Sequence, residues 1–204
     1  MKPRKILKAV PISIGALLVL GLIGAALDEK TATSATLPTE GSISNQTEAK
    51  LVRQNSKSLF ISPEYFKVAF NNFCDANKFK LLISDIEVKE GDVNNTFTVK
   101  LNESVTIVGS IEKSDGSVKE LIIIGSGNGT NEAGIKILTG ITAAIGSTDA
   151  SLAPSERGEI VKALGLLNKK TDISNHKAKY DRNGFHYWVN SNQYTGFNFG
   201  IAKN

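Results

Sequence analysis

The chain has 204 residues, with 24 Lys and Arg, 20 Asp and Glu, and a formal net charge of +4. Four N-terminal cations supply that whole excess, namely Lys2, Arg4, Lys5 and Lys8. Residues 28–204 are therefore neutral overall, which argues against a nucleic-acid-binding surface. One cysteine allows no internal disulfide, and two histidines give no cluster for a structural metal, so we expect neither a metal nor a cofactor.

An uncharged run from Ala9 to Leu27 follows the N-terminal cations. Its 19 residues come close to the about 20 that a helix needs to cross a bilayer. Because the cations lie on one side only, residues 1–8 are predicted to be cytoplasmic and the chain after Leu27 extracytoplasmic. We expect residues 9–27 to be an uncleaved transmembrane anchor. The alternative is a signal sequence cleaved after Ala26, with Gly24 as the second small residue of the cleavage site.

Residues 28–57 are predicted to be a flexible linker. Between Thr31 and Lys50 the chain has eight Ser or Thr and no apolar periodicity. The remaining residues, 58–204, are enough for one extracytoplasmic domain with its own core.

The domain is predicted to begin with a helix. Ser62 is a good N-cap, and Pro63 suits the first helical position. Four apolar side chains then recur at helical spacing, at Phe66, Ala69, Phe70 and Phe73. Cys74 lies beside that face, so we expect a buried and unreactive thiol.

Four strands should follow, at residues 81–88, 96–101, 105–111 and 118–124. Alternating apolar and polar residues in the second and third predict one buried and one solvated face. Gly116 marks a hairpin turn before the fourth strand. Four consecutive large aliphatic residues in that strand predict a central position in the sheet.

Two helices and three strands complete the expected order. The first helix, 131–146, is expected to bury its apolar side, made of Ile135, Leu138, Ile141 and Ile145. Gly134 and Gly140 predict close approach of that helix to another element.

The second helix, 154–164, should end at Gly165. Strands at 177–182 and 185–190 flank Asn183-Gly184, a strong hairpin signal. Phe197, Phe199 and Ile201 alternate in a last strand. The whole order predicts an α+β domain with an antiparallel sheet and helices packed on one face.

A glycine-rich loop, Gly125–Thr130, follows a strand and precedes a helix. It matches neither the dinucleotide pattern, which needs a third Gly at Thr130, nor the phosphate-loop pattern, which needs Lys at Ile135. Its backbone N–H groups could still bind an anion, so Gly127, Asn128 and Gly129 are candidate ligand-binding residues. The alternative interpretation is a plain connection.

Catalytic residues are harder to find. No nucleophilic Ser or Cys stands in a recognisable catalytic motif. The acidic residues Asp85, Glu87, Glu90 and Asp92 match no calcium-loop spacing and are expected to be solvated.

His186 and Trp188 form the candidate surface site. Strand periodicity puts them on one sheet face, opposite Phe185 and Tyr187, with Lys177 and Lys179 close in sequence. Aromatic side chains with nearby cations could bind sugars, peptide or an anionic polymer. The alternative is that both faces of this hairpin are covered.

Three segments carry a resemblance to known proteins. They are Ser62–Phe66, Gly125–Thr130 and Ser151–Gly158, and they resemble a group of small exported bacterial proteins of uncharacterised function, often lipoprotein-like. The resemblance spans about residues 60–204 and implies a fold without a known activity. This chain lacks the Cys that a lipoprotein would carry after its apolar segment.

The sequence thus favours a membrane-tethered extracytoplasmic domain that is not an enzyme and binds a protein or an envelope component. The alternative is an envelope hydrolase or small-molecule enzyme that uses the Gly125–Thr130 loop or the face with His186 and Trp188. A cleft with His186 near a carboxylate would favour the enzyme, and an exposed aromatic or apolar patch would favour binding.

Overall fold

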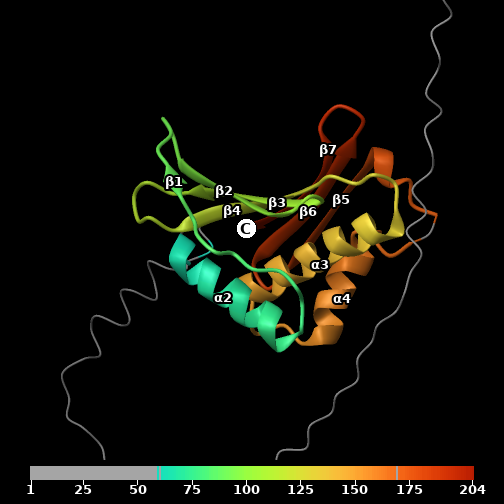
Figure 1. Ribbon diagram of the computed structural model, residues 1–204, viewed down its shortest axis with the longest axis horizontal. Helices are drawn as coiled ribbons and strands as arrows, with labels where there is room; N and C mark the ends of the chain where they lie inside the picture. Colours follow the sequence, from blue (N-terminus) through green and yellow to red (C-terminus); the bar gives the residue numbers. More distant parts are fainter. Residues whose placement is uncertain (1–58, 60, 169) are drawn as a thin grey trace, which may run out of the picture. The chain divides into compact units, whose positions relative to one another are not determined.

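A computed structural model describes residues 59, 61–168 and 170–204. In this part of the chain, helices and strands follow one another in blocks (Figure 1). The elements are α2 (Pro63–Ala76), β1 (Val88–Lys89), β2 (Asn95–Asn102), β3 (Val105–Ile111), β4 (Val118–Gly125), α3 (Asn131–Thr148), α4 (Pro154–Ala163), the 3₁₀ turn η1 (Ile173–Asn175), β5 (His176–Arg182), β6 (Phe185–Asn192) and β7 (Gly196–Lys203).

The strands form one sheet in the order β1-β2-β3-β4-β7-β6-β5, and every neighbouring pair is antiparallel. Strands β1 to β4 form one meander, and β5 to β7 form a second. The two meanders join where β4 pairs with β7. Strand β4 is therefore central, as its run of aliphatic residues predicts.

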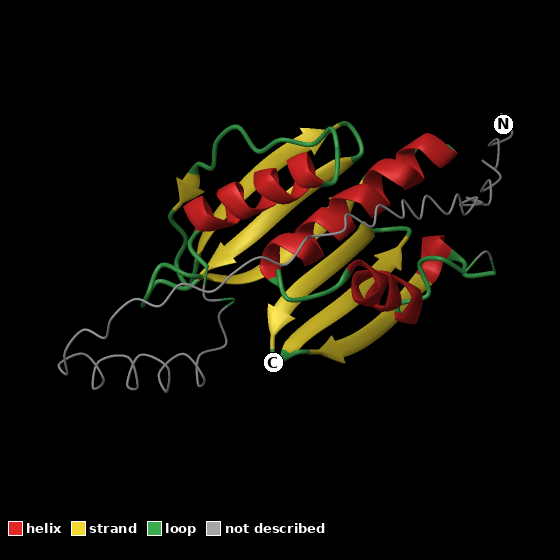
Figure 2. Cartoon of the chain, turned by 90° about the horizontal axis from the view of Figure 1, so that it is seen from below, coloured by secondary structure: helices red, strands yellow, loops and turns green. Residues whose placement is uncertain are grey.

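The three α-helices of the described chain lie across one face of this sheet, and the other face carries no helix (Figures 1 and 2). Period-2 alternation sends the apolar side chains toward the helices. The largest of those that are fully buried there are Phe97, Ile107, Leu121, Ile123, Tyr187 and Phe199. The predicted α+β class, with an antiparallel sheet and helices on one face, is thereby confirmed.

Helix α2 begins where its capping residues predict. The Tyr65 N–H donates to Ser62 Oγ at 3.1 Å, and Pro63 occupies the first turn. Phe66, Phe70 and Cys74 are buried on the predicted face.

The prediction of a strand at residues 81–88 is wrong, because in this region only Val88 and Lys89 pair with β2. A side chain of α2 takes the place of a neighbouring strand. Ile83 N–H donates to Asn71 Oδ1 at 2.8 Å, and Asn71 Nδ2 donates to Ile83 O at 2.9 Å. These two bonds satisfy the backbone N–H and C=O of Ile83 without a sheet partner.

The buried side of α3 also differs from the prediction. Ile141 and Ile145 are buried, but Ile135 is 49% exposed. The buried side of the helix is a stripe of small residues centred near Ala144. Ile135 lies on the opposite side of the helix from Ala144, because the nine-residue separation between them amounts to about two and a half turns. Small residues on this side let the helix lie close to the sheet. At Gly140, for example, a Cβ would lie only 2.8 Å from Val105 Cγ1 of β3.

Helix α4 ends near Gly165, which has φ +74°, as predicted. Polar contacts fix it to β5. Ala153 N–H donates to Glu156 Oε2 at 2.7 Å, while Arg182 of β5 binds Glu156 and lies 2.9 Å from Glu159 Oε2. The Asn183-Gly184 turn has positive φ at both residues, as that dipeptide predicts.

The predicted basic segment, anchor and linker, at residues 1–8, 9–27 and 28–57, lie outside the described residues. In the described part, no helix has both the length and the apolar character needed to span a membrane.

Cys74 provides a test of the core. It is buried, and desolvation raises the pKa of its thiol to about 11. Because the thiolate is the reactive form, Cys74 should react slowly with thiol reagents near pH 8 in the native protein and quickly after denaturation. We expect Cys74→Ala to reduce the free energy of unfolding by about 1 kcal/mol. Fast labelling of the native protein would show that this helix face is exposed.

Candidate functional site

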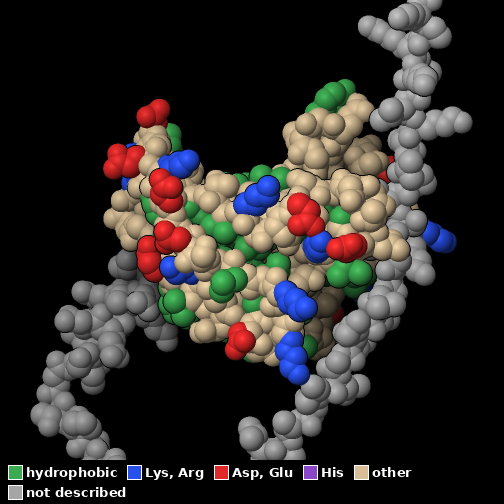
Figure 3. All heavy atoms as spheres, viewed as in Figure 1, with side chains coloured by type: hydrophobic (Ala, Val, Ile, Leu, Met, Phe, Trp, Pro, Cys, Tyr) green, Lys and Arg blue, Asp and Glu red, His purple; other side chains and the backbone are tan. Residues whose placement is uncertain are grey.

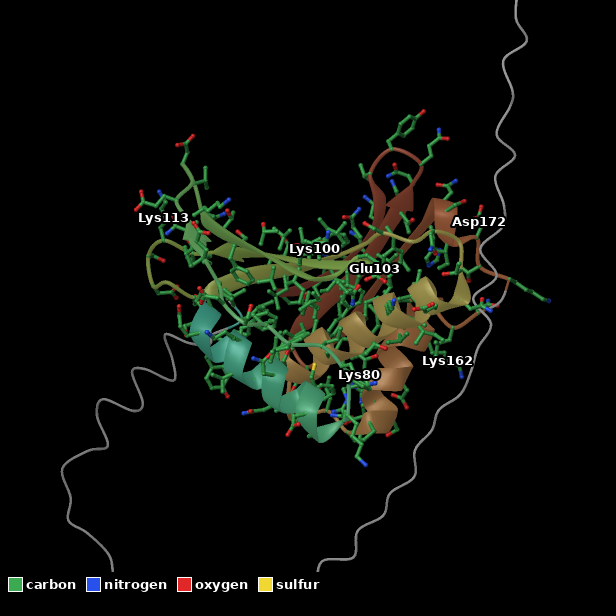
Figure 4. All side chains as sticks on the ribbon, viewed as in Figure 1. Lys80, Lys100, Glu103, Lys113, Lys162 and Asp172 are labelled. Atoms are coloured by element: carbon green, nitrogen blue, oxygen red, sulfur yellow. The ribbon has the colours of Figure 1, made fainter. Side chains whose placement is uncertain are left out.

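The helix-free side of the sheet, here called the open face, holds the predicted surface residues. In the register across the sheet, Trp188 of β6 stands beside Gly200 of β7, which stands beside Ile122 of β4. Lys100 of β2 lies on the same side (Figure 4). The described atoms are hollowed above the sheet, between its two raised ends (Figure 3).

Trp188 lies flat over the backbone of Gly200. A Cβ built on Gly200 would be 1.9 Å from Cε2 of the indole, so only glycine leaves room for this ring position. The indole Nε1 donates to Glu120 Oε1 at 3.1 Å, across β7. One ring face is therefore supported by the sheet and the ring edge is held by a carboxylate, which fixes the orientation of the side chain.

A groove of about 580 Å³ surrounds Trp188 on the open face. This open-face groove is lined by Glu120, Lys177, Ala178, Lys179, His186, Trp188, Val189, Asn190 and Ala202. All four predicted surface residues, His186, Trp188, Lys177 and Lys179, line it. Glu120 was not predicted, because its place in the groove depends on strand pairing. Asn190 was missed although alternation along β6 puts it on the same face as His186 and Trp188.

His186 has a carboxylate partner. It stands opposite Asp181 on β5, and its Nδ1 lies 2.5 Å from Asp181 Oδ1. The lining of the groove includes two lysines, Lys177 and Lys179, and one carboxylate, Glu120. Asp181 does not line the groove, but its carboxylate beside His186 adds a second negative charge on the same side of β5.

Asn190 carries an unpaired acceptor. Its Oδ1 is buried but has no hydrogen-bond partner among the described residues. A buried acceptor without a donor is unfavourable, but because this oxygen has no accessible surface, a ligand in the groove would reach it only after the Asn190 side chain moves.

The predicted glycine loop lines a second cavity, here called the glycine-loop pocket, of about 380 Å³. It lies between the end of β4, the first half of α3, η1 and the β6–β7 hairpin. Gly127 and Gly129 line this pocket, whereas Asn128 does not. Asn128 Oδ1 instead accepts from the Thr130 N–H at 3.1 Å and from Thr130 Oγ1 at 2.6 Å, which shapes the loop.

The anion site predicted at this loop has no positively charged side chain among the described residues that line the pocket. Thr130 Oγ1 accepts from the Ala133 N–H at 3.3 Å, so one of the free N–H groups at the helix start is already bonded. Among the described residues that line the pocket, none is charged. Lys136 lies nearby but bonds to Glu103 at 2.5 Å and Glu132 at 2.7 Å. Figure 4 labels Glu103 beside the start of α3.

The acidic residues near β1 remain dispersed. Asp85, Glu87, Glu90 and Asp92 are all exposed, and acidic side chains spread over that end of the molecule in Figure 3. No group of three His, Cys, Asp or Glu suited to a metal ion occurs in the described ranges.

No protein-family model matches the sequence, and comparison with curated proteins and with solved structures finds no match. The two cavities are therefore the features of the described chain that bear on its function.

The contact between Trp188 and Gly200 can be tested by a double-mutant cycle. Trp188 is partly exposed, so Trp188→Ala should lower the free energy of unfolding by about 1–3 kcal/mol, less than a full core truncation. Gly200→Ala should cost about 1–3 kcal/mol by overpacking. In the Trp188→Ala background the same Gly200→Ala change should be close to neutral, because the clashing ring is gone. Chemical denaturation of the four proteins measures this coupling, and additive effects would contradict the ring position.

Proposed function

We propose that the chain is a membrane-tethered extracytoplasmic domain that binds an envelope polysaccharide in the open-face groove. The observation that carries this proposal is the supported indole of Trp188. One face rests on Gly200, and the ring lies in a groove that also contains hydrogen-bonding side chains. This site is prepared before a ligand arrives, which limits the entropy lost on binding.

The chemistry of the groove suits a sugar ring. A pyranose presents one face of C–H groups and a rim of hydroxyls. The indole offers an apolar face with negative quadrupole charge for the C–H groups. The carboxylate of Glu120 and the ammonium of Lys179 offer an acceptor and a donor for the hydroxyls.

Other ligands fit the groove less well. A polyanion would need a clear excess of cations, but the two lysines are accompanied by Glu120 in the groove and by Asp181 beside His186. A nucleic acid is disfavoured for the same reason. A protein partner would need a wide apolar patch, whereas the groove mixes charged, amide and aromatic side chains.

One observation supports the enzyme alternative: His186 is paired with Asp181 and could act as a general base. Of the described residues that line the groove, none is a Ser, Thr or Cys that could serve as nucleophile. Binding therefore remains the better proposal.

The tether is proposed from the uncharged run of residues 9–27 and its one-sided cations. The full-length protein should sediment with membranes and resist extraction by high salt. External protease should release the domain from spheroplasts by cutting between Thr31 and Lys50. Recovery of a soluble protein that begins at Leu27 would instead support the cleaved signal sequence.

Binding can be tested with the purified full-length chain in a nonionic detergent, mixed with insoluble envelope polysaccharide and sedimented. The wild-type chain should bind, and Trp188→Ala should weaken binding at least tenfold. Tyr194→Ala is the matched control, because Tyr194 is 88% exposed on the β6–β7 turn, outside the groove.

Melting curves must first show that all three proteins are folded at the assay temperature. Equal binding by Trp188→Ala and wild type would contradict the site. Release of soluble sugar fragments during the incubation would favour the enzyme.

A further inference from the structure

The glycine-loop pocket has a chemistry different from that of the open-face groove. Its walls are apolar, formed mainly by Ile137, Leu138, Leu166, Ile173 and Phe197. Hydroxyl and amide groups from the loop, η1 and the β6–β7 hairpin also line it. With about 380 Å³, the pocket has room for roughly a dozen non-hydrogen atoms, at about 30 Å³ for each water-sized group.

Glycines keep this pocket open. At Gly125 a Cβ would lie 2.9 Å from Phe197 Cδ1 and 3.0 Å from Ile137 Cδ1, so a side chain there would displace the wall. At Gly127 a Cβ would meet only Ile137 Cδ1, at 4.0 Å. A side chain at Gly127 would therefore project toward the pocket wall without a clash.

The lining also determines which ligands are excluded. An ionised group would lose its hydration at this uncharged surface and find no opposite charge among the described lining residues. The apolar part of a ligand has no such hydration to lose, and a hydroxyl or amide end can form hydrogen bonds with the polar groups of the lining.

We propose that the glycine-loop pocket binds an uncharged small molecule with an apolar body of about ten carbons and a single hydroxyl or amide end. This site is independent of the polysaccharide site, because the pocket lies on the helix side of the sheet, whereas the groove lies on the open face. The domain would then have two ligands of different classes.

Photo-labelling of the full-length chain in its membranes tests this proposal. The two probes are a ten-carbon alcohol and the corresponding carboxylic acid, each carrying a diazirine. They are compared at pH 8, at concentrations that give equal labelling of total membrane protein. The alcohol should label peptides from residues 126–138 and 191–197. The acid should label them at least tenfold less.

Two glycine substitutions give a matched comparison. Gly127→Leu should reduce labelling of these peptides by the alcohol at least fivefold, because the new side chain fills the pocket. Gly158→Leu is the control, because this glycine of α4 has open space around it and lies outside the pocket. Protease resistance of the domain shows whether each variant is folded.

Three results would overturn the proposal: absence of label in the pocket peptides, equal labelling by the acid, or unchanged labelling of folded Gly127→Leu. The comparison of alcohol with acid uses the wild-type chain, so it decides the question even if Gly127→Leu does not fold. None of these results depends on whether the open-face groove binds polysaccharide.

Discussion

The pairing of β4 with β7 is the interaction on which the rest of the structure depends. It runs from Glu120 opposite Ala202 to Gly125 opposite Phe197, and it joins two meanders that are otherwise separate in the chain. Without it, both strands would expose unpaired backbone groups, and neither meander would cover the helices. The pairing also builds both cavities. It brings Glu120 within hydrogen-bonding distance of Trp188, 68 residues away, and it places the glycine loop beside the β6–β7 hairpin.

The two faces of the sheet have divided roles. The inner face is filled by aliphatic and aromatic side chains that contact α2, α3 and α4, and this contact stabilises the domain in place of disulfides. The open face does not contribute to that core, so its residues are free to serve recognition. Gly200 illustrates the division, because a larger residue would improve β-propensity but would remove the ring position of Trp188.

Much of the fold can be predicted from the sequence, since its signals are local. Ser62-Pro63 predicts the start of α2, Asn183-Gly184 the β5–β6 hairpin, and period-2 alternation the faces of β2, β3 and β6. The strand predicted at residues 81–88 does not form as predicted, because Asn71, twelve residues away in sequence, binds the backbone of Ile83 in place of a neighbouring strand. The candidate site divides in the same way. His186 and Trp188 share a strand and are found by alternation, whereas Glu120 joins them only through the pairing of β4 with β7, which has no local signal.

The fluorescence of Trp188 tests the central claim most directly, that the open face presents this indole to solvent from a fixed position. It is the chain's single tryptophan, so the emission has one source. In the native full-length protein, acrylamide should quench this emission less than in the unfolded chain but clearly more than for a core indole. Added envelope polysaccharide should then protect it from quenching. Emission that acrylamide cannot quench in the native protein would show that the open face is covered and would contradict the account.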